Sequence, residues 1–219
     1  MLILIRHPQT GANVGKGSQG PLVRGWMDVP LDQTGLRDAE QTTRLVASPT
    51  TGPPPPKAVF TSDLQRARSL AEMIAKSTGA KLIVTPGLRT WNVGSLAGQP
   101  VSRVKDALKN YTKGGTSAPP NGEPHRAFLQ RFLHTFTQIG QQAKAVGVPV
   151  AIVTHASGVR AIYSLLTRGT VDPTLSDGMA KAADPVPPGG FVVLTPSGSS
   201  WKWGKVTGDH LATTLSTGS

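Results

Sequence analysis

The sequence of 219 residues predicts a single α/β domain with three layers, a mainly parallel sheet with helices on both faces. Short apolar runs, typical of buried strands, alternate along the chain with longer stretches whose apolar residues recur at helical spacing. The chain lacks cysteine, which excludes a disulfide scaffold and a thiol nucleophile. No apolar run approaches the ~20 residues that span a bilayer. We therefore expect a cytoplasmic protein with no membrane contact.

The predicted strands are short apolar runs, most of them continuous, as in parallel strands that are buried on both faces. They cover residues 1–5, 57–60, 82–84, 148–153, 191–194 and 201–206. The last two flank Pro196, Ser197 and Gly198, so we expect them to form a terminal hairpin.

The predicted helices follow the strands and cover residues 34–46, 101–111, 127–146 and 159–166, with a further helix that begins after Ser62 and ends at Gly79. Thr34 and Ser62 are the residue types that favour the N-cap position. Phe128, Phe132 and Phe136 recur at a spacing of four, so this stripe of the longest helix is expected to lie in the core.

The connections are rich in glycine, proline and polar residues. Residues 8–31 are expected to form a long loop, 51–56 a proline-rich surface connection, and 169–190 an insertion of low order. We expect one domain over residues 1–206 and a polar C-terminal tail over 207–219.

The chain is strongly basic, with 23 Lys and Arg against 12 Asp and Glu, a formal charge of 23 − 12 = +11. Such a charge attracts either a nucleic acid backbone or small phosphorylated anions. The basic residues are scattered, and no compact Lys/Arg tract with interleaved aromatic residues occurs. We therefore do not expect nucleic-acid binding to be the main role.

Two histidines directly follow predicted strands, His7 after the first and His155 after the fourth. Ligands of parallel α/β sheets bind beyond the carboxyl ends of the strands, so neighbouring strands would bring both rings to one pocket. Arg6, Asn13 and Arg66 are expected at the same end. The backbone N–H groups of the helix that starts near Ala156 would add an anion site there. Several fixed donors of this kind suit a phosphoryl group.

Four segments resemble motifs of the histidine phosphatase superfamily, the phosphoglycerate mutase-like group. They occur in the family's order and are Arg6-His7-Pro8-Gln9-Thr10-Gly11-Ala12-Asn13, Gly25-Trp26-Met27-Asp28-Val29-Pro30-Leu31 with Gly35, Ser62-Asp63-Leu64-Gln65-Arg66-Ala67, and Val153-Thr154-His155-Ala156-Ser157-Gly158. Each motif alone is weak, but four in this order are specific. The resemblance implies the phosphoglycerate mutase-like fold.

The resemblance also implies a role for each matched position. His7 would be the nucleophile and would form a phosphohistidine. The phosphoryl oxygens would be held by Arg6, Asn13, Arg66, His155 and the N–H of Ala156, and the substrate by Thr10, Arg24, Gly25 and Trp26. No metal and no cofactor would be needed, because the arginines supply the positive charge.

The sequence departs from the family pattern at the usual general acids. Thr90 stands where many members have glutamate, and Ala156 stands where another branch has aspartate. Glu123, just before the longest helix, is the best replacement, and Asp28 is the second choice. A purely structural role, as a helix N-terminal charge for Glu123 or a turn former for Asp28, is the alternative for each.

Pro8 replaces the motif glycine after His7. Proline lacks a backbone N–H and has a fixed φ, so any contact that the family makes through that N–H is lost here.

These features predict a metal-independent phosphohydrolase that acts on a phosphorylated small molecule or phosphoprotein through His7. Two alternatives stay open: a catalytically weakened protein that binds a phosphorylated ligand, and a phosphomutase. The sequence determines neither the natural substrate nor the oligomeric state.

Overall fold

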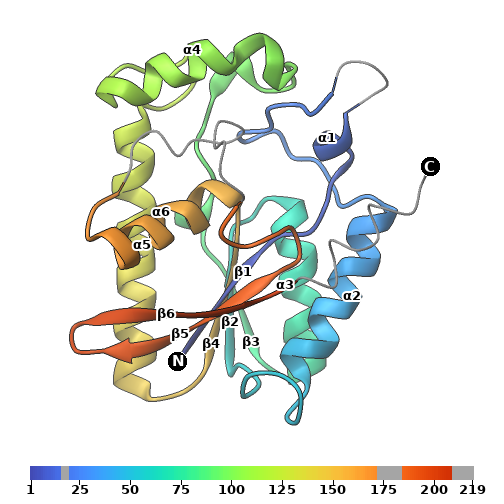
Figure 1. Ribbon diagram of the computed structural model, residues 1–219. Helices are drawn as coiled ribbons and strands as arrows, with labels where there is room; N and C mark the ends of the chain where they lie inside the picture. The colour runs from blue at the N-terminus through green and yellow to red at the C-terminus, as the bar shows by residue number, and fades with distance from the viewer. Residues whose placement is uncertain (16–19, 172–183, 209–219) are drawn as a thin grey trace.

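The computed structural model describes residues 1–15, 20–171 and 184–208, whose strands form one sheet (Figure 1). These strands are β1 (Leu2–Arg6), β2 (Ala58–Thr61), β3 (Lys81–Val84), β4 (Val150–Thr154), β5 (Phe191–Ser197) and β6 (Ser200–Thr207). Their order across the sheet is β3-β2-β4-β1-β5-β6. β3, β2, β4 and β1 are parallel, β5 is antiparallel to β1, and β6 is antiparallel to β5. The predicted mainly parallel sheet and terminal hairpin are confirmed.

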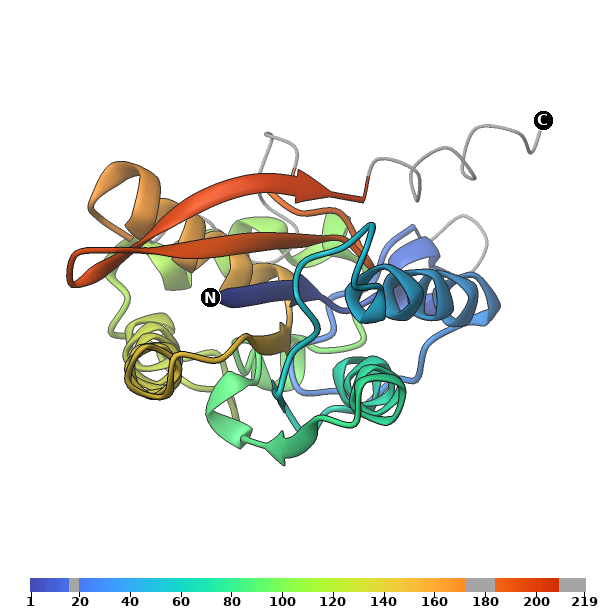
Figure 2. The ribbon, with the colours of Figure 1, turned by 90° about the horizontal axis from the view of Figure 1, so that it is seen from below.

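Helices cover both faces of the sheet, as predicted. They are α1 (Gly11–Val14), α2 (Gln33–Ala47), α3 (Gln65–Thr78), α4 (Val101–Gly114), α5 (His125–Val146) and α6 (Ala156–Arg168), with two short 3-10 turns, η2 (Pro86–Leu88) and η3 (Gly94–Leu96). Figure 2 shows α2 and α3 on one side of the sheet and α5 and α6 on the other.

The side chains of β1 explain this arrangement, because successive residues of a strand point to opposite faces. Leu2 and Leu4 belong to the core that contains Phe132 of α5, whereas Ile3 and Ile5 belong to the second core beneath α2 and α3. These four apolar side chains of β1 are fully buried. A continuous apolar strand is therefore required in the middle of the molecule.

Both predicted N-caps are wrong. The cap of α2 is Asp32, whose carboxylate accepts the N–H of Gly35 at 2.8 Å. Asp32 and Thr34 both favour caps and are two residues apart, so the pattern does not separate them. Ser62 lies before α3, whose N-cap position is Leu64. The hydroxyl of Ser62 contacts a histidine of the candidate site instead.

Parts of two predicted segments, residues 172–183 of the insertion and 209–219 of the tail, lie outside the described residues. The division into a domain and a tail stays a prediction; β6 ends at Thr207, the first residue of the predicted tail. Within the described ranges, no helix has the length and apolar content needed to cross a membrane. The cytoplasmic location stays a prediction as well.

The carboxyl ends of the parallel strands meet below α4 (Figure 1). Arg6 at the end of β1 lies opposite Thr154 at the end of β4, so His7 and His155 leave the sheet side by side. β2 lies on the other side of β4 and brings Ser62 to the same edge.

Candidate active site

The two predicted histidines lie together at this edge of the sheet. The ring centroids of His7 and His155 are 5.2 Å apart with an angle of 63° between the planes. Each residue is only 2% exposed. Burial is the main cause that holds the pKa of both rings well below the ordinary value of 6.5, followed by the neighbouring His155 for His7 and by the positive charge of Arg66 for His155. Both imidazoles are therefore neutral at neutral pH.

His7 is held in one tautomer. Its Nδ1 lies 2.6 Å from the carbonyl oxygen of Pro8. A carbonyl only accepts, so Nδ1 carries the hydrogen and Nε2 has the lone pair. A neutral imidazole with an unprotonated Nε2 is a nitrogen nucleophile. Proline at position 8 keeps this contact, because the contact uses the carbonyl and not the missing N–H.

His155 occupies the N-cap position of α6. Its Nε2 lies 2.8 Å from the hydroxyl of Ser62, and its Nδ1 is buried without a hydrogen-bond partner among the described groups. Buried polar atoms without a partner are rare, and this one is open to a hydrogen bond with a ligand or a water.

Arg66 is 1% exposed and is held by the loop that carries the Gly25–Leu31 motif. Its Nη1 donates to the carbonyl of Met27 at 2.9 Å and its Nη2 donates to the carbonyl of Gly25 at 2.8 Å. Gly25 has a φ of +49°, a conformation that favours glycine. Asp28 of the same loop accepts the N–H of Gln65 at 2.7 Å. Asp28 therefore anchors the start of α3, which agrees with a structural role rather than with that of a general acid.

Asn13 is the centre of a small polar network. Its Oδ1 accepts the backbone N–H of Thr10 at 2.9 Å, the hydroxyl of Thr10 at 2.8 Å and Nη1 of Arg24 at 2.7 Å. This network fixes the start of α1 and places Arg24 beside it. Sequence reasoning placed all three residues at the site, and the structure brings them together.

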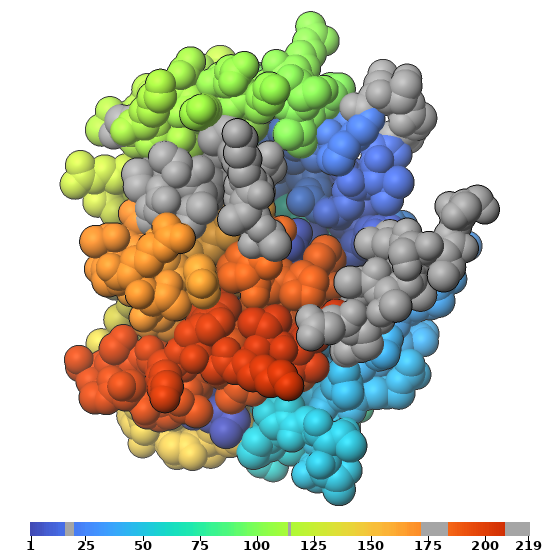
Figure 3. Space-filling model, in the orientation of Figure 1, coloured from blue at the N-terminus to red at the C-terminus, as the bar shows by residue number. Residues whose placement is uncertain are grey.

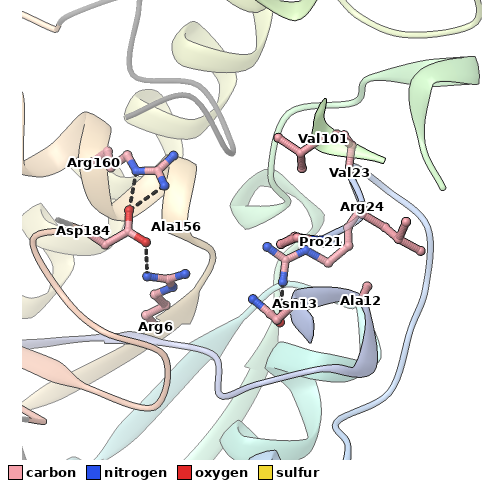
Figure 4. Close-up of a pocket in the computed structure, with 11 residues that line it drawn as sticks. Arg6, Ala12, Asn13, Pro21, Val23, Arg24, Val101, Ala156, Arg160 and Asp184 are labelled. Carbon is pink, nitrogen blue, oxygen red and sulfur yellow. Dashed lines mark hydrogen bonds and ion pairs between the residues drawn. The ribbon is translucent and has the colours of Figure 1, made fainter. Parts of the chain in front are cut away.

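A cavity of about 200 Å³ opens beside the histidines. Figure 4 shows Arg6, Asp184 and Arg160 on one side of it and Asn13 and Arg24 on the other. The remaining lining is largely apolar and includes Pro21, Leu22, Val23 and Val101. In Figure 3 the surface is hollowed below α4, beside the N-terminal residues.

Of the predicted site residues, Arg6, Asn13, Arg24 and Ala156 line this cavity. His7 and His155 are the chain neighbours of Arg6 and Ala156. Neither they nor Arg66 line the cavity, and all three are buried. Thr10, Gly25 and Trp26 are not in the lining. Thr10 and Gly25 instead hold Asn13 and Arg66, whereas Nε1 of Trp26 donates to the carbonyl of Thr90 at 2.8 Å.

Sequence reasoning did not identify two charged lining residues, Arg160 and Asp184. Arg160 lies four residues after Ala156 on α6, and this spacing places both on the same helical face. That spacing could have identified Arg160 as a residue of the site. Asp184 lies in the predicted insertion, where no periodic pattern indicates a role.

Glu123 does not line the cavity. Its carboxylate accepts Nη2 of Arg131 at 2.7 Å and the N–H of Asn92 at 3.0 Å. The carboxylate is therefore engaged by protein donors and is absent from the lining of the cavity. This geometry favours the structural alternative for Glu123.

Thr90 is buried, and its hydroxyl lies 2.5 Å from the hydroxyl of Ser157. The position of the family's usual acid is therefore occupied by a pair of hydroxyl groups, with Ser157 on the first turn of α6. Among the described residues there is no group of three His, Cys, Asp or Glu side chains that could hold a metal ion.

The chain is similar in sequence and in fold to known phosphatases and phosphoglycerate mutases. The chain is 29% identical over 176 residues to a metal-independent phosphoserine phosphatase of Arabidopsis thaliana, covering 77% of this chain and 69% of the relative. It is 29% identical to a 2,3-bisphosphoglycerate-dependent phosphoglycerate mutase of Cytophaga hutchinsonii, covering 77% and 78%. The structure of a mycobacterial glucosyl-3-phosphoglycerate phosphatase superposes with a TM-score of 0.69 at 20% identity, covering 94% and 96%. Residues 2–182 match the histidine phosphatase superfamily (branch 1), and the chain belongs to this family.

Proposed function

We propose that the protein is a metal-independent phosphohydrolase of small phosphorylated molecules that works through a phosphohistidine at His7. The observation that carries this proposal is the state of His7: buried, neutral, and held by the carbonyl of Pro8 with Nε2 unprotonated. Arg6 and Arg66 supply the positive charge that a transferring phosphoryl group needs. The two relatives named as phosphatases support the choice of reaction class.

The reaction has two steps. Nε2 of His7 attacks the phosphorus atom, an N–P bond forms, and the P–O bond to the leaving group breaks. Water then attacks the phosphohistidine, the N–P bond breaks, and inorganic phosphate leaves while the proton of the water passes to solvent. His155 donates from Nδ1 to a phosphoryl oxygen, and Ser62 donates to Nε2, which keeps this tautomer.

The carboxyl groups near the cavity are poorly suited to protonate a leaving group. Glu123 is bound by Arg131, and Asp28 accepts the N–H of Gln65 at the start of α3. Burial raises the pKa of Asp184, but the charges of Arg6 and Arg160 outweigh this effect and hold the pKa below its ordinary value. We therefore propose substrates whose leaving group needs little protonation, such as acyl phosphates, phosphoanhydrides or aryl phosphates.

Hydrolysis is preferred to mutase action, although relatives of both kinds occur. A mutase must keep the dephosphorylated substrate bound, so that the phosphoryl group on the enzyme can be returned to it. The wall formed by Pro21, Leu22, Val23 and Val101 offers few polar groups for that purpose. A cavity of about 200 Å³ suits a small molecule better than a phosphoprotein.

The test is hydrolysis of an aryl phosphate in the presence of a chelator. We expect turnover by the wild type, loss of turnover in His7→Ala, and wild-type rates in His134→Ala, which replaces an exposed histidine of α5. Thermal stabilisation by inorganic phosphate without turnover would overturn the hydrolase and favour the alternative, a protein that binds a phosphorylated ligand. Equal rates for wild type and His7→Ala would exclude His7 as the nucleophile.

A further inference from the structure

One carboxylate joins two buried arginines at the wall of the cavity (Figure 4). Asp184 Oδ2 accepts Nη1 of Arg6, and Oδ1 accepts Nε of Arg160 at 2.6 Å and its Nη2 at 2.5 Å. The side chains of Arg6 and Arg160 are 6% and 7% exposed, and that of Asp184 is 24% exposed. We propose that Asp184 is a positioning residue that, with Arg160, orients Arg6 toward the phosphoryl group.

The hydrogen bonds of Arg6 show how this works. Nη1 donates both of its hydrogens to one short segment, one to Asp184 and one to the carbonyl of Val186 at 3.0 Å. Nε is buried and has no partner among the described groups. The guanidinium is a planar fork, so fixing Nη1 also fixes the direction of Nε. The edge that carries Nε is thereby left without a protein partner, and we assign it to the ligand.

The backbone around Arg6 belongs to the same arrangement. The N–H of Arg6 donates to the carbonyl of Gly190 at 3.0 Å, and the N–H of Gly189 donates to the carbonyl of Arg6 at 3.2 Å. Residues 184–190 therefore hold Arg6 at the side chain and at the main chain. Arg160 ties the same segment to α6, the helix whose first turn faces the cavity through Ala156.

Asp184 also acts on the arginines of the cavity through its negative charge. Three guanidinium groups, those of Arg6, Arg24 and Arg160, line the cavity, and Asp184 is the one carboxylate among the described lining residues. Burial and the charges of Arg24 and Arg160 lower the pKa of Arg6, whereas Asp184 raises it. Removing the carboxylate would leave Arg6 and Arg160 to repel each other, and Arg6 would lose its orientation.

An alternative is that Asp184 competes with the phosphoryl group for Arg6. The two ideas predict opposite effects on anion affinity. The geometry favours positioning, because Asp184 uses Nη1 and leaves Nε for the ligand. This inference rests on the proposed function for its reaction, but the affinity for an anion can be measured without turnover.

The experiment compares wild type with Asp184→Asn, which keeps the shape and removes the charge. We expect the affinity for inorganic phosphate by calorimetry, the inhibition by vanadate, and kcat/KM for an aryl phosphate to fall together. The expected loss is about ten- to a hundred-fold, by analogy with the groups that orient metal ligands. Glu72→Gln, which breaks an exposed pair with Arg68, should change none of them. Asp184→Glu, which keeps the charge, should recover part of the loss.

Each other outcome is decisive. Tighter phosphate binding by Asp184→Asn would show competition and overturn the positioning role. A lower melting temperature with unchanged phosphate affinity would show a merely structural role and overturn it as well. If the wild type binds phosphate without turnover and Asp184→Asn binds it more weakly, the positioning role stands and the hydrolase fails. If the wild type turns over and Asp184→Asn matches it, only the positioning role fails.

Discussion

The hydroxyl of Ser62 lies 2.8 Å from Nε2 of His155, across 93 residues of sequence. Both groups are buried, and this contact fixes the imidazole ring on the side away from its unpartnered Nδ1. Ser62 follows β2 and His155 follows β4, so the parallel pairing of these strands creates the contact.

We therefore expect Ser62→Ala to lower kcat/KM by about tenfold and the free energy of unfolding by about 1 kcal/mol, the usual effect of losing one buried hydrogen bond. Steady-state kinetics and urea unfolding measure the two effects. Ser95→Ala, which removes an exposed hydroxyl contact with the carbonyl of Pro120, is the control. Wild-type kcat/KM in Ser62→Ala would show that His155 needs no such support.

The buried histidines predict how stability depends on pH. The folded-state pKa of His7 and of His155 lies well below 6.5, so the unfolded chain binds protons that the folded chain does not. The free energy of unfolding should therefore fall as the pH drops below about 6.5. Urea unfolding at several pH values between 7.5 and 5 measures this. A stability that rises on acidification would contradict the assignment of both buried histidines as neutral.

The hydroxyl pair at Thr90 and Ser157 predicts a strong dependence on the leaving group. Without an acid at this position, the rate should fall steeply as the pKa of the leaving group rises across a series of aryl phosphates. Replacing Thr90 by glutamate requires space that the Ser157 hydroxyl, 2.5 Å from the Thr90 hydroxyl, occupies. The double variant Thr90→Glu with Ser157→Gly should therefore flatten the dependence, with a gain of up to about 100-fold for the poorest leaving groups. A flat dependence in the wild type would reveal a proton donor that this assignment omits.

Glu123→Gln should affect stability more than catalysis. The variant loses the charge that binds Arg131, and both side chains are partly buried, at 18% and 26% exposure. We expect the free energy of unfolding to fall by about 1 kcal/mol, since partial exposure screens the pair. Hydrolysis of a substrate with a high leaving-group pKa should change less than threefold. A loss of 100-fold or more, confined to such substrates, would restore Glu123 as the general acid.

The sequence predicted the pairing of the two histidines because it depends on strand ends. Continuous apolar runs identified β1 and β4, and polar residues directly after such strands in a parallel sheet gather at one edge. Arg66 and Asn13 were expected there for the same reason and because of their motifs. Local sequence patterns are therefore enough to predict where these residues lie.

Side-chain contacts between distant segments that do not follow from strand ends could not be predicted. The ion pair of Arg6 with Asp184 joins residues 178 positions apart, and the hydrogen bond of Thr90 with Ser157 joins residues 67 apart. Nothing in the local pattern distinguishes Asp184 from a solvated aspartate. The ion pair of Glu123 with Arg131 likewise depends on how the loop before α5 folds back onto that helix.

The most direct test of the central claim is to trap the intermediate. The wild type is mixed with an excess of aryl phosphate in the presence of a chelator, quenched rapidly in alkali, in which phosphohistidine survives, and its peptides are analysed by mass spectrometry. We predict a single phosphoryl group on the peptide that contains His7, absent from His7→Ala and present in His134→Ala. Turnover by the wild type with no phosphoryl group on His7 at any quench time, or with the group on His155, would contradict His7 as the nucleophile.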